Sequence, residues 1–170
     1  MIRGLRTSRR STAFHEAGHV VAMIEMNLPV RSASAIANAE SLGRVKGGPL
    51  RISDVDLYNL TPRTRDRLER QIIVTFAGPE AERLFLKRYN HTWAANDYDR
   101  ASDLLLRLTA GDSAETSAYV RWLRLRSRSL IDRRRALVEA VANALTERGT
   151  LTAAQIMETI ADSIKRAVDH

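Results

Sequence analysis

The segment His15-Glu16-Ala17-Gly18-His19 contains residue types that can carry out hydrolysis. Two histidines four positions apart on a helix project from one face, so both can reach a single ion. In zinc hydrolases with this spacing, the imidazoles and a third protein ligand hold Zn²⁺, and a water takes the open position. The adjacent Glu16 would be the general base that accepts a proton from that water. The plain alternative is a pair of helix histidines that bind nothing.

The third ligand must come from elsewhere in the chain. The extended motif with a further histidine fails, because Ala22 and Glu25 stand where glycine and histidine would be needed. The chain has no cysteine, so only histidine and carboxylate side chains remain. An acid in a first helical turn after a capping Asn96 would be held rigidly, which favours Asp97 without excluding the others. The candidates are His91, Glu80, Glu82, Asp97, Asp99 and Asp103.

Hydrophobic spacing predicts a mostly α chain. The helix with the motif is expected from about Thr12 to Asn27, capped by Ser11 or Thr12 and stopped by Leu28-Pro29. Four more helical regions are expected. The first starts at Thr61-Pro62 and is broken or bent at Gly78-Pro79, and the second runs from Asn96 to near Gly111. The third runs through Ala118 to Arg148 and is broken once, and the fourth starts with a capping box at Thr152 and Gln155. Their buried stripes are Leu68, Ile72, Ile73 and Phe76; Ala101, Leu104, Leu105 and Leu108; Leu137, Val138, Val141 and Leu145; and Ile156, Ile160 and Ile164.

The remaining segments have the composition of loops and one strand. Alternating alanines within Arg31 to Leu42 predict a short exposed strand, so a small β element is expected near residues 31–45. Gly43 to Leu60 and Lys87 to Ala95 are expected to be loops. We therefore expect a basic N-terminal segment at residues 1–10 and one domain over residues 11–168.

Composition excludes several classes of protein. A chain of 170 residues with 44% hydrophobic residues is typical of one compact domain. It has no apolar stretch of the roughly 20 residues needed to span a bilayer. We also find no secretory leader and no phosphate-binding loop. We therefore expect a cytoplasmic protein with no membrane segment.

The net charge of +7 comes mostly from arginine, which accounts for 24 of the 27 basic residues. A dense group of arginines lies in residues 121–135. Apolar side chains are interspersed among them as in an amphipathic helix, namely Trp122, Leu123, Leu125, Leu130 and Ile131. We interpret these arginines as a solvated helix face and a nucleic-acid partner as unlikely, because no nucleic-acid motif accompanies them. The group is Arg121, Arg124, Arg126, Arg128, Arg133, Arg134 and Arg135.

The chain resembles the peptidase domain of the FtsH-type, membrane-anchored AAA zinc metalloproteases from about Ser11 to Ile164. The matching pieces follow the order of that family. The most specific pieces are those around the His15-Glu16-Ala17-Gly18-His19 motif and around Asp97. One piece departs from the family, which has a double glycine with paired glutamates where this chain has Gly78-Pro79-Glu80-Ala81-Glu82. The pieces are residues 13–21, 41–43, 68–84, 95–102 and 137–160.

The resemblance implies a zincin-like helical metallopeptidase domain with bound Zn²⁺. It implies that His15, His19 and Asp97 are the zinc ligands and that Glu16 is the catalytic base. It also implies that a strand at about Arg31 to Ile36 receives the substrate by main-chain pairing. This strand consists of Arg31, Ser32, Ala33, Ser34, Ala35 and Ile36.

Members of the family carry a membrane segment and an ATP-driven unfolding module, for which this sequence has no motif. We therefore expect an ATP-independent zinc metallopeptidase that cleaves peptides or unfolded segments, with folded substrates delivered by a separate unfoldase or adaptor. Assembly into a homo-oligomer is left open. One alternative is a catalytically silent binding or regulatory module that uses the arginine-rich surface. A second is a nucleic-acid-binding protein that contains the motif by accident.

Overall fold

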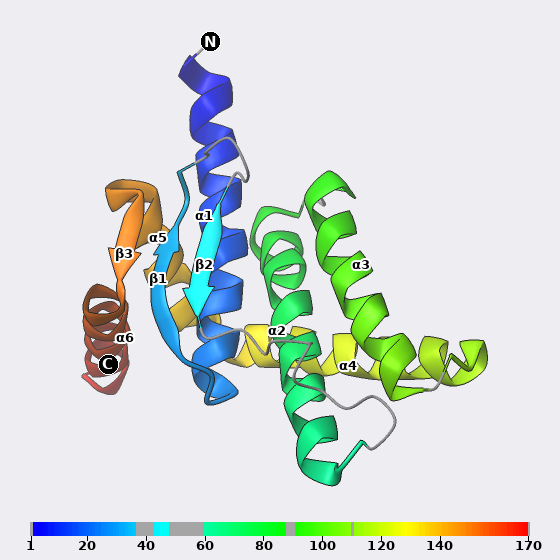
Figure 1. Cartoon of the computed structure of the whole chain (residues 1–170). Coiled ribbons are helices and arrows are strands. Elements are labelled where there is room, and N and C mark those ends of the chain that lie inside the picture. Colours follow the sequence, from blue (N-terminus) through cyan, green and yellow to red (C-terminus); the bar gives the residue numbers. More distant parts are fainter. Residues whose placement is uncertain (1, 37–42, 48–59, 88–90, 110, 170) are drawn as a thin grey trace.

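The computed structural model describes residues 2–36, 43–47, 60–87, 91–109 and 111–169, with backbone only at 2–8, 91–96, 100 and 107. These residues form a mostly α fold with a small antiparallel sheet, as the sequence predicts (Figure 1). The elements in chain order are α1 (Ile2–Glu25), β1 (Val30–Ser34), β2 (Arg44–Gly47), α2 (Pro62–Leu86), α3 (His91–Leu108), α4 (Ser113–Arg133), α5 (Arg135–Arg148), β3 (Thr150–Thr152) and α6 (Ala153–Val168).

Helix α1 is the central element of the fold. It packs against α2 on one side, against α5 on another, and against the sheet. Gly18 allows α1 and α2 to approach closely, because a Cβ there would collide with the Ala77 carbonyl oxygen and lie 2.7 Å from the Ala81 Cβ. Further along the same contact, the rings of Phe14 and Phe85 stack with centroids 4.8 Å apart. This close crossing brings the motif on α1 against the middle of α2.

The sheet has the strand order β2-β1-β3, with both pairs antiparallel. In its register Ala33 lies opposite Val45 on one side and Leu151 on the other. Ala33, Ala35 and Leu151 are buried, so alternating alanines do mark the inner face of a strand. The strand is nevertheless central rather than exposed, because β3 comes from a distant part of the sequence.

Most of the predicted buried stripes and helix ends are confirmed. The stripes on α2, α3 and α5 are buried or packed on the core. The long C-terminal helical region breaks once, at Arg134, and α5 ends at Arg148, followed by Gly149 with a φ of 79°. Thr152 and Gln155 form the expected capping box. The prediction for Ile164 is wrong, because this side chain is 51% exposed.

Two predicted helix starts are wrong, and of the predicted break or bend at Gly78-Pro79 the break does not occur. α1 begins at Ile2 rather than Thr12, so Ser11 lies inside the helix and caps nothing. α2 continues through Pro79. An internal proline costs a helix about 3 kcal/mol, and here the burial of the whole segment Ile72–Glu82 offsets that cost. α3 begins at His91 within the predicted loop, because Ala94 and Ala95 are strong helix formers, so Asn96 does not cap it.

The predicted loop from Gly43 to Leu60 is also partly wrong, because β2 forms at its start. Residues 37–42, 48–59 and 88–90, which complete the predicted strand and loops, lie outside the described residues. Within the described ranges, no helix combines the length and apolar character needed to cross a membrane.

Candidate metal centre

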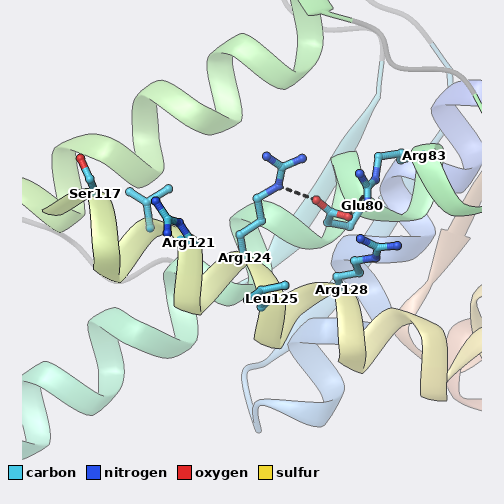
Figure 2. Close-up of a pocket in the computed structure, with 8 residues that line it drawn as sticks. Glu80, Arg83, Ser117, Arg121, Arg124, Leu125 and Arg128 are labelled. Carbon is cyan, nitrogen blue, oxygen red and sulfur yellow. Dashed lines mark hydrogen bonds and ion pairs between the residues drawn. The ribbon is translucent and has the colours of Figure 1, made fainter.

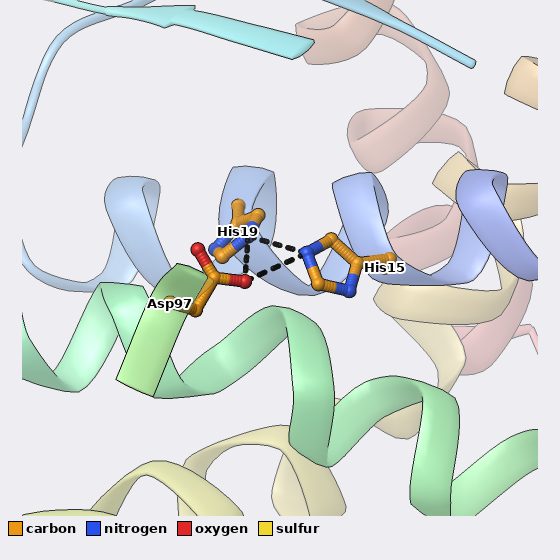
Figure 3. Close-up of side chains that lie close together, drawn as sticks. All are labelled: His15, His19 and Asp97. Atoms are coloured by element: carbon orange, nitrogen blue, oxygen red, sulfur yellow. Dashed lines mark hydrogen bonds and ion pairs between the residues drawn. The ribbon is translucent and has the colours of Figure 1, made fainter. Parts of the chain in front are cut away.

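Two helices bring three potential metal ligands together (Figure 3). On α1 the imidazoles of His15 and His19 lie one turn apart, with their Nε2 atoms 3.0 Å from each other. On α3 the Asp97 carboxylate points at both rings. Its Oδ2 atom is 3.0 Å from the Nε2 of His15 and 3.7 Å from the Nε2 of His19. The structure therefore places the three residues that the family resemblance selects within reach of a single ion.

The spacing of these three atoms suits a zinc ion. Ligand bonds of about 2.0–2.1 Å in a tetrahedral site place neighbouring ligand atoms about 3.3 Å apart. The observed separations of 3.0, 3.0 and 3.7 Å lie on both sides of that value. Two imidazole nitrogens and one carboxylate oxygen are also a donor set that zinc prefers. A tetrahedral ion held by three protein atoms would keep one position for water.

His19 is held in the orientation that a metal ligand requires. Its Nδ1 lies 2.8 Å from the carbonyl oxygen of Val74 on α2. Since that carbonyl can only accept, Nδ1 is the donor in this contact, and Nε2 is the ring nitrogen that faces His15 and Asp97. A main-chain group of α2 therefore fixes the direction of this ring.

His15 has a carboxylate on the side of its ring opposite to the cluster. Its Nδ1 lies 3.6 Å from Oε2 of the buried Glu82, whose other oxygen accepts a hydrogen bond from the Ser11 hydroxyl. A carboxylate behind a histidine ligand orients the ring and raises its basicity. Glu82, a candidate third ligand on sequence alone, is instead placed to support His15.

Gly78 on α2 forms the wall of the cluster. A Cβ at this position would lie 2.5 Å from the Nε2 of His19 and 2.7 Å from the Nε2 of His15. Any other residue would therefore occupy the space between α2 and the two nitrogens. The absence of a side chain leaves room for an ion.

Glu16 is buried, with 6% of its surface exposed. Burial raises the pKa of its carboxyl, and the nearby charges of His19 and His15 partly oppose that rise. Gly43, next to β2, lies against the carboxylate, since a Cβ there would be 2.5 Å from Oε1 of Glu16. A glutamate with a raised pKa is suited to accept a proton near neutral pH.

The pKa values of His15 and Asp97 are shifted in the directions expected of an ion pair. Burial lowers the pKa of His15, but hydrogen bonds to Asp97 and Glu82 and the charges of Asp97 and Glu16 raise it to about 10. Burial raises the pKa of Asp97, but the hydrogen bonds to His15 and His19 and the charges of both rings together outweigh burial and hold that pKa well below its usual range. Without metal, a proton on His15 supplies the positive charge that the cluster favours.

The remaining candidate ligands lie elsewhere. Glu80 accepts from Arg124 at 2.7 Å and pairs with Arg83 at 3.2 Å, on the far side of α2. Asp99 and Asp103 are exposed to solvent. The side chain of His91 lies outside the described part of the chain.

The predicted substrate strand, Arg31 to Ile36, needs correction. Residues Ser32 to Ser34 pair with β2 on one side and β3 on the other, and the Ala35 amide donates to the Gly149 carbonyl at 2.7 Å. These main-chain groups are therefore not available for a substrate strand. Among the described strands, β2 forms the outer edge on the side of Glu16.

Sequence reasoning missed three supporting features of the cluster. The carbonyl of Val74 could not be found, because a main-chain contact has no residue signature. Gly78 was visible only as a helix breaker, although a glycine inside a buried apolar helix is itself a sign of close packing. Glu82 was identified as an acid of interest, but the ring nitrogen that it faces depends on how α1 and α2 pack.

Comparison with known proteins adds a distant relationship. No family model matches the chain. Two curated relatives, both called ATP-dependent zinc metalloprotease FtsH, are similar over 102 residues, or 59% of this chain. The protein from Magnetococcus marinus is 33% identical and that from Acidobacterium capsulatum 30% identical. The chain is distantly similar to FtsH. The matched residues span only 14% and 15% of the lengths of these two proteins.

Proposed function

We propose that this protein is a zinc-dependent metallopeptidase whose zinc ligands are His15, His19 and Asp97 and whose general base is Glu16. One observation carries the proposal. Ligand atoms from α1 and α3 converge within 4.8 Å of one another, beside a buried glutamate and a glycine that leaves space for an ion. The distant similarity to proteins called zinc metalloprotease agrees with it.

Each residue then has a separate task in peptide hydrolysis. A zinc ion held by the three ligands would lower the pKa of a coordinated water and polarise the scissile carbonyl. Glu16 takes the proton of the attacking water and later gives it to the leaving amine. Val74 and Glu82 would keep the two imidazoles aimed at a bound ion, while burial excludes bulk water from Glu16.

We propose unfolded segments and peptides as substrates. An extended chain could add to the outer edge of β2, since Gly43 places the start of that strand against Glu16. Pairing through the main chain would make the enzyme tolerant of substrate sequence. The residues assigned here to catalysis need no nucleotide, so we propose ATP-independent hydrolysis by one domain over residues 11–168, with any folded substrate delivered by a separate unfoldase or adaptor.

Casein hydrolysis by the Glu16→Gln variant tests the proposal. We expect a loss of at least about 100-fold, because general-base catalysis contributes that much, while the zinc content stays equal to wild type. Glu139→Gln, an exposed change on α5, is the control and should keep wild-type turnover. Equal turnover in Glu16→Gln would contradict the mechanism. Zinc-loaded wild type that cleaves neither casein nor unstructured peptides would favour the silent binding module.

A further inference from the structure

A basic pocket lies between α2 and α4 (Figure 2), and none of His15, His19 and Asp97 lines it. It has a volume of about 430 Å³, which is within the range of small-ligand sites. Four arginines and one glutamate give its lining a net charge of +3, and Val120, Leu125 and Ser117 complete the wall. The charged residues are Glu80, Arg83, Arg121, Arg124 and Arg128.

Two of the arginines, Arg83 and Arg124, are held in place by a buried carboxylate. Glu80, whose side chain is 2% exposed, binds the Nε atoms of Arg124 and Arg83 at 2.7 and 3.2 Å. The guanidinium of Arg124 also lies over the ring of Tyr98, 5.3 Å from its centroid. Since these contacts fix the two guanidinium groups before any ligand arrives, less conformational entropy is lost on binding.

The other two arginines supply uncompensated charge. Arg121 and Arg128 are exposed, and no carboxylate in the described part of the chain lies within ion-pair distance of either. They stand about two turns apart on α4, with Arg124 between them on the same face. Three guanidinium groups along one helix face, opposite a fourth from α2, can surround an anion with several oxygens.

We propose that this pocket binds a small oligophosphate, such as a diphosphate group. Pyrophosphate carries a charge of about −3 near neutral pH, which matches the pocket, and phosphate oxygens suit bidentate guanidinium contacts. A single-stranded nucleic acid fits less well, because the exposed Trp122 ring on α4 already contacts two side chains of its own helix. Trp122 stacks on Tyr119 with centroids 5.6 Å apart and carries Arg126 at 4.9 Å from its ring.

Calorimetric titration of the metal-free full chain with pyrophosphate, in chelator and at low ionic strength, tests this site. Removing metal prevents phosphate from binding at the cluster, so the result does not depend on the proposed peptidase function. We expect one site per chain, and binding at least tenfold weaker in Arg121→Gln/Arg128→Gln. The control Arg63→Gln/Arg67→Gln removes the same charge from exposed positions on α2 outside the pocket and should stay within twofold of wild type.

Several outcomes would overturn the proposal. These are no pyrophosphate binding, equal weakening in both double variants, or binding of an oligonucleotide but not of pyrophosphate. A titration with ADP distinguishes the source of the diphosphate. Tighter binding of ADP than of pyrophosphate would mean that Val120 and Leu125 contact a nucleoside, and equal binding would mean that the phosphates alone are recognised.

Discussion

Helix α2 carries two glutamates, Glu80 and Glu82, that are equally buried and face opposite partners. Each is 2% exposed. Residues two apart on a helix project from nearly opposite faces, so Glu80 reaches Arg124 on α4 while Glu82 reaches His15 on α1. Two glutamates that are equally buried therefore have their negative charge balanced by different groups, a guanidinium for Glu80 and an imidazole for Glu82.

The two partners determine what each side of α2 can do. A guanidinium stays charged at all ordinary pH values, so the Glu80 side is a fixed ion pair that neither releases a proton nor binds a metal. An imidazole can exchange its proton for a metal ion, so the Glu82 side can change state. Reactivity in this molecule therefore lies where the group that pairs with a buried carboxylate is titratable, rather than where the charge is densest.

The largest expected effect follows from metal removal, which should act on the histidine side alone. With zinc at about a thousandfold excess over its Kd, binding adds about 4 kcal/mol to the free energy of unfolding. Chelator should therefore lower the Tm of the zinc-loaded protein, as measured by differential scanning calorimetry. His15→Ala/His19→Ala should show no response to chelator. A wild-type Tm that chelation leaves unchanged would remove the distinction between the two sides.

A change of pH should give the next largest effect, in the metal-free protein. The pKa of His15 is about 10 when folded and 6.5 when unfolded. Its stabilising contribution is therefore full below pH 6.5 and is lost as the pH rises towards 10, at no more than about 1.4 kcal/mol per pH unit. Asp97 has a lowered pKa, so its contribution is present above pH 3.8 and is lost as the pH falls.

Urea unfolding between pH 6 and 9 in chelator measures this slope. The control His15→Gln should have a flatter profile, because the amide side chain of glutamine does not titrate. Zinc affinity should rise with pH over the same range, because the metal displaces the proton from His15. A wild-type profile as flat as that of the control would show that His15 does not hold its proton in the folded protein.

Alanine substitutions of the two glutamates separate the sides most directly. Glu80→Ala should destabilise the protein by about 1–3 kcal/mol, whether or not zinc is present, because it removes the buried carboxylate that pairs with Arg83 and Arg124. Glu82→Ala should weaken zinc binding about 10- to 100-fold, because it removes the group behind a histidine ligand. Unfolding in urea and zinc titration measure the two effects. An equal loss of zinc affinity in both variants would contradict the comparison.

The helices could be predicted from the sequence because the information for them is local. Regular apolar spacing marks the buried stripes of α2, α3 and α5, and the capping box at Thr152 marks the start of α6. The pair His15 and His19 could be identified for the same reason, since one helix sets their separation. Asp97 could be selected only through the family resemblance, because no local signal joins α3 to α1.

The remaining features depend on contacts between distant segments. Pro79 ought to interrupt α2, but its burial against neighbouring elements keeps the helix continuous. Strand β1 is central because β3, more than a hundred residues later, pairs with it, and three residues are too few to give a strand pattern. Asp97 also does not lie in the first turn of its helix, as the sequence predicted, since α3 begins six residues before it.

The central claim is that one divalent ion is held by His15, His19 and Asp97. It is tested most directly by zinc titration of the metal-free wild type, of Asp97→Ala and of Asp99→Ala, an exposed aspartate two residues further along the same helix. We expect one zinc ion per chain with equal affinity in wild type and Asp99→Ala, and a loss of at least about 100-fold in Asp97→Ala. Wild-type affinity in Asp97→Ala would contradict it.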